Sequence, residues 1–138
     1  MGPKLYRVIL PVSDINRAEE FYTTVLGITG ERISPGRHYF DCGGVILACF
    51  DPRPDGDSFD ARPNQEHLYF AVDDLEAVYG RVKKLGTLSS ENGDGGLPMG
   101  EMVLRPWGER SFYASDPFGN PLCFVDEKTL FTGKSGGE

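Results

Sequence analysis

The sequence has few cysteines, no long apolar run and a deficit of positive charge. Its three cysteines, Cys42, Cys49 and Cys123, lack the spacing of a disulfide framework, which favours a reducing, cytoplasmic location. No apolar run approaches the ~20 residues of a membrane span, and the segment MGPKLYRVIL does not fit a secretory signal. Lys and Arg number 14 against 21 Asp and Glu, which gives a net charge of −7 without a basic cluster. We therefore expect neither nucleic-acid nor membrane binding.

What is present is typical of one globular domain. Apolar residues make up 39% and charged residues 25% of the chain, and 138 residues are too few for two independent mid-sized domains. Aromatic residues are plentiful, with nine Phe, six Tyr and one Trp. The acidity favours neutral or cationic ligands, or serves only solubility.

One phrase occurs twice. RVILPVSD (7–14) and HLYFAVDD (67–74) both alternate in polarity, which predicts a strand in each. A capping residue follows, either Ser13 or Asp14 in the first copy and an aspartate at 73 or 74 in the second. A helical apolar pattern then runs to Gly27 and to Gly86, where we expect each helix to end. The copies lie about 60 residues apart, which indicates a duplicated unit.

Short β-type segments follow each predicted helix, at 28–34, 37–42 and 44–50 in the first half and at 102–106, 110–115 and 121–127 in the second. We predict an α+β fold of two βαβββ modules, 5–51 and 66–127, within a single domain 1–138. The Pro-, Gly- and Asp-rich segment 52–65 is interpreted as a linker, and 128–138 as a flexible tail. The glycine-rich segment 89–101 is interpreted as a mobile loop, either a lid or a surface loop without function.

These elements carry a family resemblance. The segments VSDINRAEEFYTTVLG (12–27), HLYFAVDDLEAV (67–78) and RPWGERSFYASDPFGNPLCFVDE (105–127) resemble the vicinal oxygen chelate superfamily. This superfamily includes glyoxalase I, extradiol dioxygenases, fosfomycin-resistance enzymes and bleomycin-resistance proteins. The resemblance implies tandem βαβββ modules that form a curled mixed sheet around a cleft, commonly in a homodimer.

The resemblance also implies four metal-ligand positions, on the first and last strand of each module. Arg7 and His67 occupy the two first-strand positions, Cys123 occupies one last-strand position, and the other falls on Leu47, Ala48 or Cys49. A divalent ion needs nitrogen and carboxylate donors, and a guanidinium does not ligate a cation. We therefore expect no cofactor and a likeness to the metal-free bleomycin-resistance-like members. A divalent metal held by His67 as a remnant site, together with Cys123, is the alternative.

His67, Cys123 and Arg7 are the charged or reactive candidates for the site. For His67 the alternatives are a general base, a hydrogen-bond partner of the ligand, or a histidine that only lines the cleft. For Cys123 the alternatives are a thiolate nucleophile paired with His67 or a small buried hydrophobic residue. Arg7 would bind a ligand carboxylate or phosphate, or would pair with Glu66, Asp51 or another acidic residue.

Six aromatic residues lie on segments that line the cleft in the resembling family: Tyr39, Phe50, Tyr69, Trp107, Phe112 and Tyr113. Flat rings bind planar apolar or cationic ligands, although core packing must account for most of them. Trp107, in the loop PWG, is the exception that we single out.

The leading functional hypothesis is a metal-independent, cytoplasmic protein that sequesters a small molecule, with Arg7, His67, Tyr69, Trp107 and Cys123 at the ligand-binding site. One alternative is an enzyme of the same superfamily, a metal-dependent or His67/Cys123-dependent lyase, isomerase or dioxygenase. Another is a non-catalytic dimeric scaffold.

Overall fold

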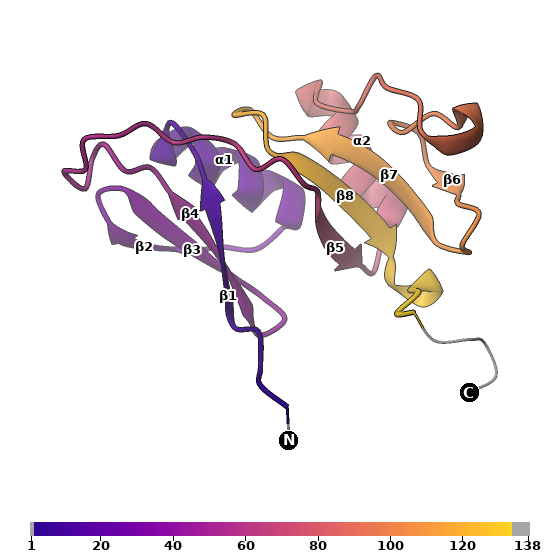
Figure 1. Cartoon of the computed structure of the whole chain (residues 1–138), viewed down its shortest axis with the longest axis horizontal. Coiled ribbons are helices and arrows are strands. Elements are labelled where there is room, and N and C mark those ends of the chain that lie inside the picture. The colour runs from indigo at the N-terminus through magenta and orange to yellow at the C-terminus, as the bar shows by residue number, and fades with distance from the viewer. Residues whose placement is uncertain (1, 134–138) are drawn as a thin grey trace. The chain divides into compact units, whose positions relative to one another are not determined.

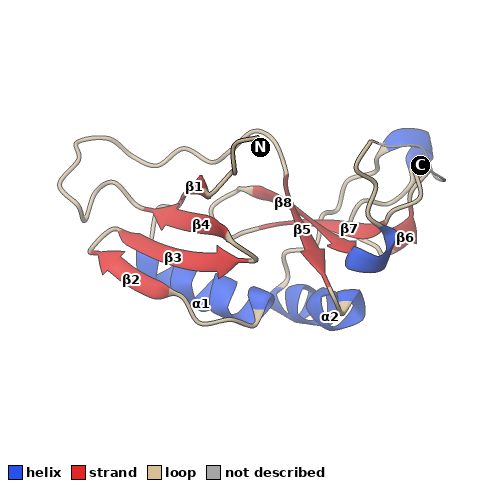
Figure 2. Cartoon of the chain, turned by 90° about the horizontal axis from the view of Figure 1, so that it is seen from below, coloured by secondary structure: helices blue, strands red, loops and turns tan. Residues whose placement is uncertain are grey.

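The computed structural model describes residues 2–133. The chain divides into two compact units, Met1–Gln65 with Pro117–Asn120, and Glu66–Asp116 with Pro121–Glu138. Each unit contains one helix and a four-stranded sheet (Figures 1 and 2). Within the described residues, no helix is long and apolar enough to cross a membrane. The predicted α+β fold of two tandem βαβββ modules is confirmed, and each module has its own sheet.

The first unit consists of β1 (Arg7–Pro11), α1 (Ile15–Leu26), β2 (Glu31–Ser34), β3 (Arg37–Cys42) and β4 (Val45–Phe50). The strand order is β1-β4-β3-β2, with β1 parallel to β4 and the other pairs antiparallel. In Figure 2, α1 lies along one face of this sheet. The Asp14 side chain caps α1 by accepting from the Arg17 N–H at 3.1 Å, and Gly27 ends the helix with φ 69°.

The core of the first unit lies between α1 and the sheet. Tyr22 on the helix and Phe40 on β3 are fully buried, and their ring centroids are 6.2 Å apart. The turn 117–120 also belongs to this unit, and its Asn120 side chain is fully buried. Asn120 accepts from the Asn64 N–H at 2.8 Å and donates to the Pro11 carbonyl at 2.7 Å. Asn120 thus joins the linker and the end of β1.

The second unit consists of β5 (Leu68–Val72), α2 (Leu75–Leu85), the 3₁₀ turn η1 (Asp94–Gly96), β6 (Val103–Leu104), β7 (Arg110–Ser115), β8 (Pro121–Asp126) and the 3₁₀ turn η2 (Glu127–Thr129). The strand order is β5-β8-β7-β6, the same as in the first unit. Asp74 caps α2 by accepting from the Ala77 N–H, and Gly86 ends the helix with φ 75°. The second repeat therefore uses the later of its two candidate aspartates, as the first uses the later of Ser13 and Asp14.

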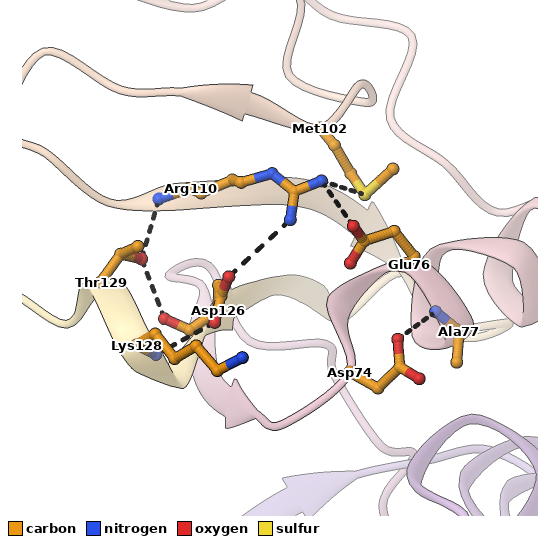
Figure 3. A network of polar contacts seen from close by, with 8 residues as sticks. All are labelled: Asp74, Glu76, Ala77, Met102, Arg110, Asp126, Lys128 and Thr129. Carbon is orange, nitrogen blue, oxygen red and sulfur yellow. Dashed lines mark hydrogen bonds and ion pairs between the residues drawn. The ribbon is translucent and has the colours of Figure 1, made fainter.

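The helix-facing side of the second sheet is aromatic. Phe124 stacks on both Phe70 and Phe112 at 5.3 and 5.2 Å, and Phe112 meets Tyr79 of α2 edge-on. Arg110, also on β7, donates to Glu76 of α2 at 3.0 Å and lies 3.7 Å from the Asp126 carboxylate (Figure 3). Phe112 is therefore a core residue of this face rather than a cleft residue, because strand alternation places it opposite Tyr113.

The C-terminal segment, predicted as a tail from residue 128, begins inside η2. The Thr129 hydroxyl accepts from the Arg110 N–H at 3.0 Å, and the Phe131 N–H donates to the Glu109 carboxylate at 2.9 Å. Residues 134–138 of the predicted tail lie outside the described residues.

Candidate ligand-binding site

The second sheet carries a row of polar and aromatic side chains on the face opposite α2. The register pairs Tyr69 with Cys123 and Cys123 with Tyr113, so these three side chains point to the same face across three strands. Tyr69 is 60% exposed, whereas Cys123 is fully buried. The predicted alternation of β5, with Leu68 and Phe70 on the other face, is thus confirmed.

His67 lies directly before β5 and packs against this row. Its ring centroid is 5.0 Å from that of Tyr113 and 6.4 Å from that of Tyr69, and the two tyrosine rings are 6.4 Å apart. The His67–Tyr113 and Tyr69–Tyr113 pairs are edge-to-face, a favourable aromatic geometry. His67 and Tyr69 therefore lie on one strand face, as predicted.

The glycine-rich segment 89–101 forms a wall beside this row. It is bonded to β7 at Tyr113, whose N–H donates to the Met99 carbonyl at 2.7 Å and whose carbonyl accepts from the Ser89 N–H at 3.0 Å. Within the segment, the Gly93 N–H donates to the Leu97 carbonyl at 2.7 Å. A side chain at Gly100 would overlap the carbonyl oxygen of Ser89. Glycine at position 100 therefore permits the two halves of the segment to approach each other.

Arg105 and Trp107 come from the turn that joins β6 to β7. Arg105 is buried, at 4% exposure, and its guanidinium lies 5.0 Å from the centre of the Tyr113 ring. Trp107 is 42% exposed, and its indole N–H donates to the Glu109 carboxylate at 2.8 Å. The turn closes through the Arg105 N–H, which donates to the Glu109 carbonyl at 2.7 Å.

These elements enclose a pocket of about 250 Å³ within the second unit. Its lining combines aromatic rings, apolar loop residues and one buried cation: His67, Tyr69, Gly93, Leu97, Met99, Arg105, Pro106, Trp107 and Tyr113. The structure thus brings together His67, Tyr69 and Trp107 of the predicted ligand-binding residues. Arg105, Leu97 and Met99 were not predicted, although Leu97 and Met99 lie within the predicted loop 89–101 and Arg105 directly precedes the PWG turn.

Cys123 belongs to the core beneath this pocket, in a cluster with Tyr113, Val125 and the partly buried Met99. Burial raises the pKa of the Cys123 thiol to about 11, although hydrogen bonds with Ser111 and Tyr113 act in the opposite direction. Burial likewise raises the pKa of the Tyr113 hydroxyl. Both groups are therefore protonated at neutral pH, and Cys123 has the environment of a structural cysteine.

Arg7 lies in the first unit and is exposed. Its guanidinium carbon is 5.0 Å from the centre of the Tyr6 ring and 5.6 Å from that of Tyr39. These cation–π contacts hold its side chain within the first unit. Of the acidic partners considered for it, Asp51 accepts from the Arg53 N–H at 3.2 Å.

The repeat identifies the fourth metal-ligand position of the family. Tyr69, two residues after His67, pairs with Cys123, and Ile9, two residues after Arg7, pairs with Ala48. Ala48 is therefore the counterpart of Cys123, which selects it from the three candidates at 47–49. Among residues 2–133, no group of three or more His, Cys, Asp or Glu side chains is placed to hold a metal ion.

A second hollow, of about 390 Å³, lies in the first unit beside the linker. Phe59 lies in its lining and is 56% exposed. Asp60, also in the lining, pairs with Arg53 at 2.8 Å. Phe50, one of the six aromatic residues considered for the cleft, lines this hollow, whereas the predicted ligand-binding residues do not.

The duplicated βαβββ architecture and the aromatic pocket define the class of protein. A sequence profile of the Glyoxalase/Bleomycin resistance protein/Dioxygenase superfamily matches residues 4–124, and the chain belongs to this superfamily. No curated protein matches it in sequence.

Several solved structures share the fold. Lactoylglutathione lyase from Agrobacterium tumefaciens is 24% identical with a TM-score of 0.67, covering 92% of this chain and 96% of that one. The protein described as Oxidase ChaP-H2 is 24% identical with a TM-score of 0.72, covering 99% and 100%. A glyoxalase-related enzyme from Fulvimarina pelagi is 17% identical with a TM-score of 0.67, covering 96% and 95%. At these identities the likeness concerns the fold alone.

Proposed function

We propose that this protein binds and sequesters a small organic molecule in the pocket of its second unit, without a divalent metal. The observation that carries the proposal is the pocket lining itself, in which Tyr69, Tyr113, His67 and Trp107 present four aromatic rings around about 250 Å³. Pockets lined mainly by apolar and aromatic side chains with a few polar groups typically hold a small ligand by burying its apolar surface.

The preferred ligand is planar and either uncharged or cationic. Arg105 is the only charged side chain in the pocket lining of the described residues, and all three of its guanidinium nitrogens donate to protein oxygens. An anion would therefore have to compete with these bonds for the guanidinium. The aromatic rings of the lining and the net charge of −7 favour a cation instead.

The absence of a metal is supported by the chemistry of the four family positions. Arg7 is a cation, Ala48 has no donor atom, and Cys123 is a buried thiol whose pKa is about 11. A thiol binds a divalent ion as the thiolate, so burial of Cys123 opposes ligation. His67 alone has the donor that such a site requires.

An enzyme of the same superfamily is the second candidate function. It is favoured by the half-buried His67 imidazole in the pocket lining, next to the exposed Tyr69, where it could exchange a proton with a bound ligand. We also propose that the protein is a cytoplasmic homodimer. Sedimentation analysis would measure its oligomeric state.

Trp107 is the only tryptophan of the chain, so its fluorescence reports on the pocket. Three bicyclic probes separate ligand classes: 2-methoxynaphthalene is neutral, N-methylquinolinium is cationic and 2-naphthoate is anionic. We expect the first two to bind in isothermal titration and to change Trp107 emission, with Trp107→Ala weakening binding about tenfold, the equivalent of one ring contact. Preferential binding of 2-naphthoate would contradict the ligand class.

A metal titration completes the test. We expect Zn²⁺, Ni²⁺, Mn²⁺ and Fe²⁺ to show no tight stoichiometric binding to the protein. Tight binding that is lost in His67→Ala would contradict the metal-free proposal. Turnover of methylglyoxal–thiol adducts, catechols or epoxide antibiotics would favour the enzyme.

A further inference from the structure

The glycine-rich segment 89–101 supplies three of the residues that line the pocket, Gly93, Leu97 and Met99. The segment contains little regular structure, only the turn η1 and an isolated bridge between Asn92 and Pro98, although backbone hydrogen bonds also join Met99 to Glu91 and tie the segment to Tyr113. Irregular segments of this kind are ordinarily more mobile than helices and strands. The shape of the pocket therefore depends on whatever holds this segment in place.

Arg105 holds the C-terminal half of the segment. Its Nη1 donates to the Pro98 carbonyl at 3.2 Å, and its Nη2 donates to the carbonyls of Met99 at 3.3 Å and Glu101 at 3.2 Å. On the other side, Nε donates to the Ser111 hydroxyl at 3.0 Å and Nη2 to the Ser111 carbonyl at 3.1 Å. One buried side chain thus joins three loop carbonyls to strand β7.

The geometry requires a guanidinium. Its planar fork distributes donors over three nitrogens, whereas the single ammonium nitrogen of a lysine cannot reach acceptors on both sides. A buried cation is costly unless it is fully hydrogen-bonded, and bonds to a charged donor are stronger than neutral ones. The Tyr113 ring adds a cation–π contact at 5.0 Å.

We propose that Arg105 is the positioning residue of this pocket, which fixes the segment 89–101 so that the wall formed by Leu97 and Met99 exists before a ligand arrives. The effect of Arg105 on ligand affinity rests on the proposed function, whereas its effect on the order of the segment 89–101 does not. Without Arg105 the wall is ordered for a fraction of the time, and the apparent dissociation constant rises in inverse proportion to that fraction.

The test compares Arg105→Lys with Arg110→Lys. Arg110 is a matched control because it belongs to the same unit and makes its own ion pairs, with Glu76 and Asp126, on the α2 face of the sheet (Figure 3). Hydrogen exchange of the ligand-free proteins is followed at the amides of Gly93, Met99 and Tyr113, all of which donate within or to the segment. Binding of 2-methoxynaphthalene is then measured by titration.

We expect these three amides to exchange about tenfold faster in Arg105→Lys, the equivalent of one lost charge-assisted bond, with the amides of α2 unchanged. The probe should bind about tenfold more weakly in this variant but reach the same change in Trp107 emission at saturation. In Arg110→Lys, affinity and loop exchange should match the wild type. If Arg105→Lys does not fold, Ser111→Ala, which removes one acceptor, replaces it.

Unchanged exchange of the segment in Arg105→Lys would overturn the positioning role. Faster exchange with unaltered probe affinity would overturn it as well, because the wall would then be irrelevant to binding. If the wild type binds none of the three bicyclic probes, the proposed function fails, while the exchange measurement still decides whether Arg105 orders the wall.

Discussion

The Cys123 thiol should be unreactive in the folded protein. Its pKa is about 11, so at pH 8 about 0.1% of it is thiolate, since each pH unit below the pKa is a factor of ten. An ordinary cysteine with a pKa of about 8.5 is about one-quarter thiolate at the same pH. The smaller thiolate fraction alone therefore lowers the rate at which Cys123 reacts with an alkylating reagent about 200-fold relative to an ordinary cysteine. Complete burial of Cys123 lowers this rate further.

Maleimide labelling at pH 8, followed by mass spectrometry of the peptides, measures this rate. Cys42 is the internal reference, because it is only partly buried, although burial and the nearby Asp41 raise its pKa as well. We expect Cys42 to be labelled first, and Cys49 and Cys123 to be labelled only after unfolding in guanidinium.

The refuting result is labelling of Cys123 in the folded protein as fast as Cys42, with a pH dependence centred near neutrality. That outcome would show a stabilised thiolate and would favour the His67/Cys123 enzyme over the binding protein. His67→Ala is the control, since the buried-thiol account expects no change in the Cys123 labelling rate, whereas a catalytic pair requires a large decrease.

Three further predictions concern stability, each measured by urea unfolding. Asp74→Ala removes the cap of α2 and should cost about 1 kcal/mol. Asn120→Ala leaves two partly buried backbone groups without this partner and should cost about 3 kcal/mol, with a cost below 1 kcal/mol contradicting the account. Burial lowers the pKa of His38 more than Glu19 raises it, so the unfolded chain binds the proton more tightly and stability should decline as the pH falls below about 6.5. His38→Gln should remove this decline.

Local rules were sufficient to predict the skeleton of the fold. Asp14 and Asp74 cap helices and Gly27 and Gly86 end them because capping depends on the nearest few residues. The repeat then predicted the order of elements along the chain, whereas the order of strands within each sheet came only from the structure.

The pocket was only partly predictable. His67, Tyr69 and Trp107 were identified because aromatic and titratable residues on strand faces and loops are chemically conspicuous. Arg105 was missed because its role depends on carbonyl groups that reach it only in the folded loop. Phe112 was considered for the cleft because its strand lines the cleft in the resembling family, although alternation with Tyr113 already places the two on opposite faces.

In the wall of the pocket, the residues that fix the backbone conformation differ from the residues whose side chains form the pocket surface. Gly100 and Arg105 fix the backbone conformation of the segment 89–101, while the side chains of Leu97 and Met99, both half-buried, contribute to the pocket surface. Substitutions of Leu97 and Met99 by other residues should change the ligand preference of the pocket without changing the fold or the backbone of the segment. The pocket is therefore a convenient starting point for directed evolution. Substitutions at the two anchoring positions offer no such freedom.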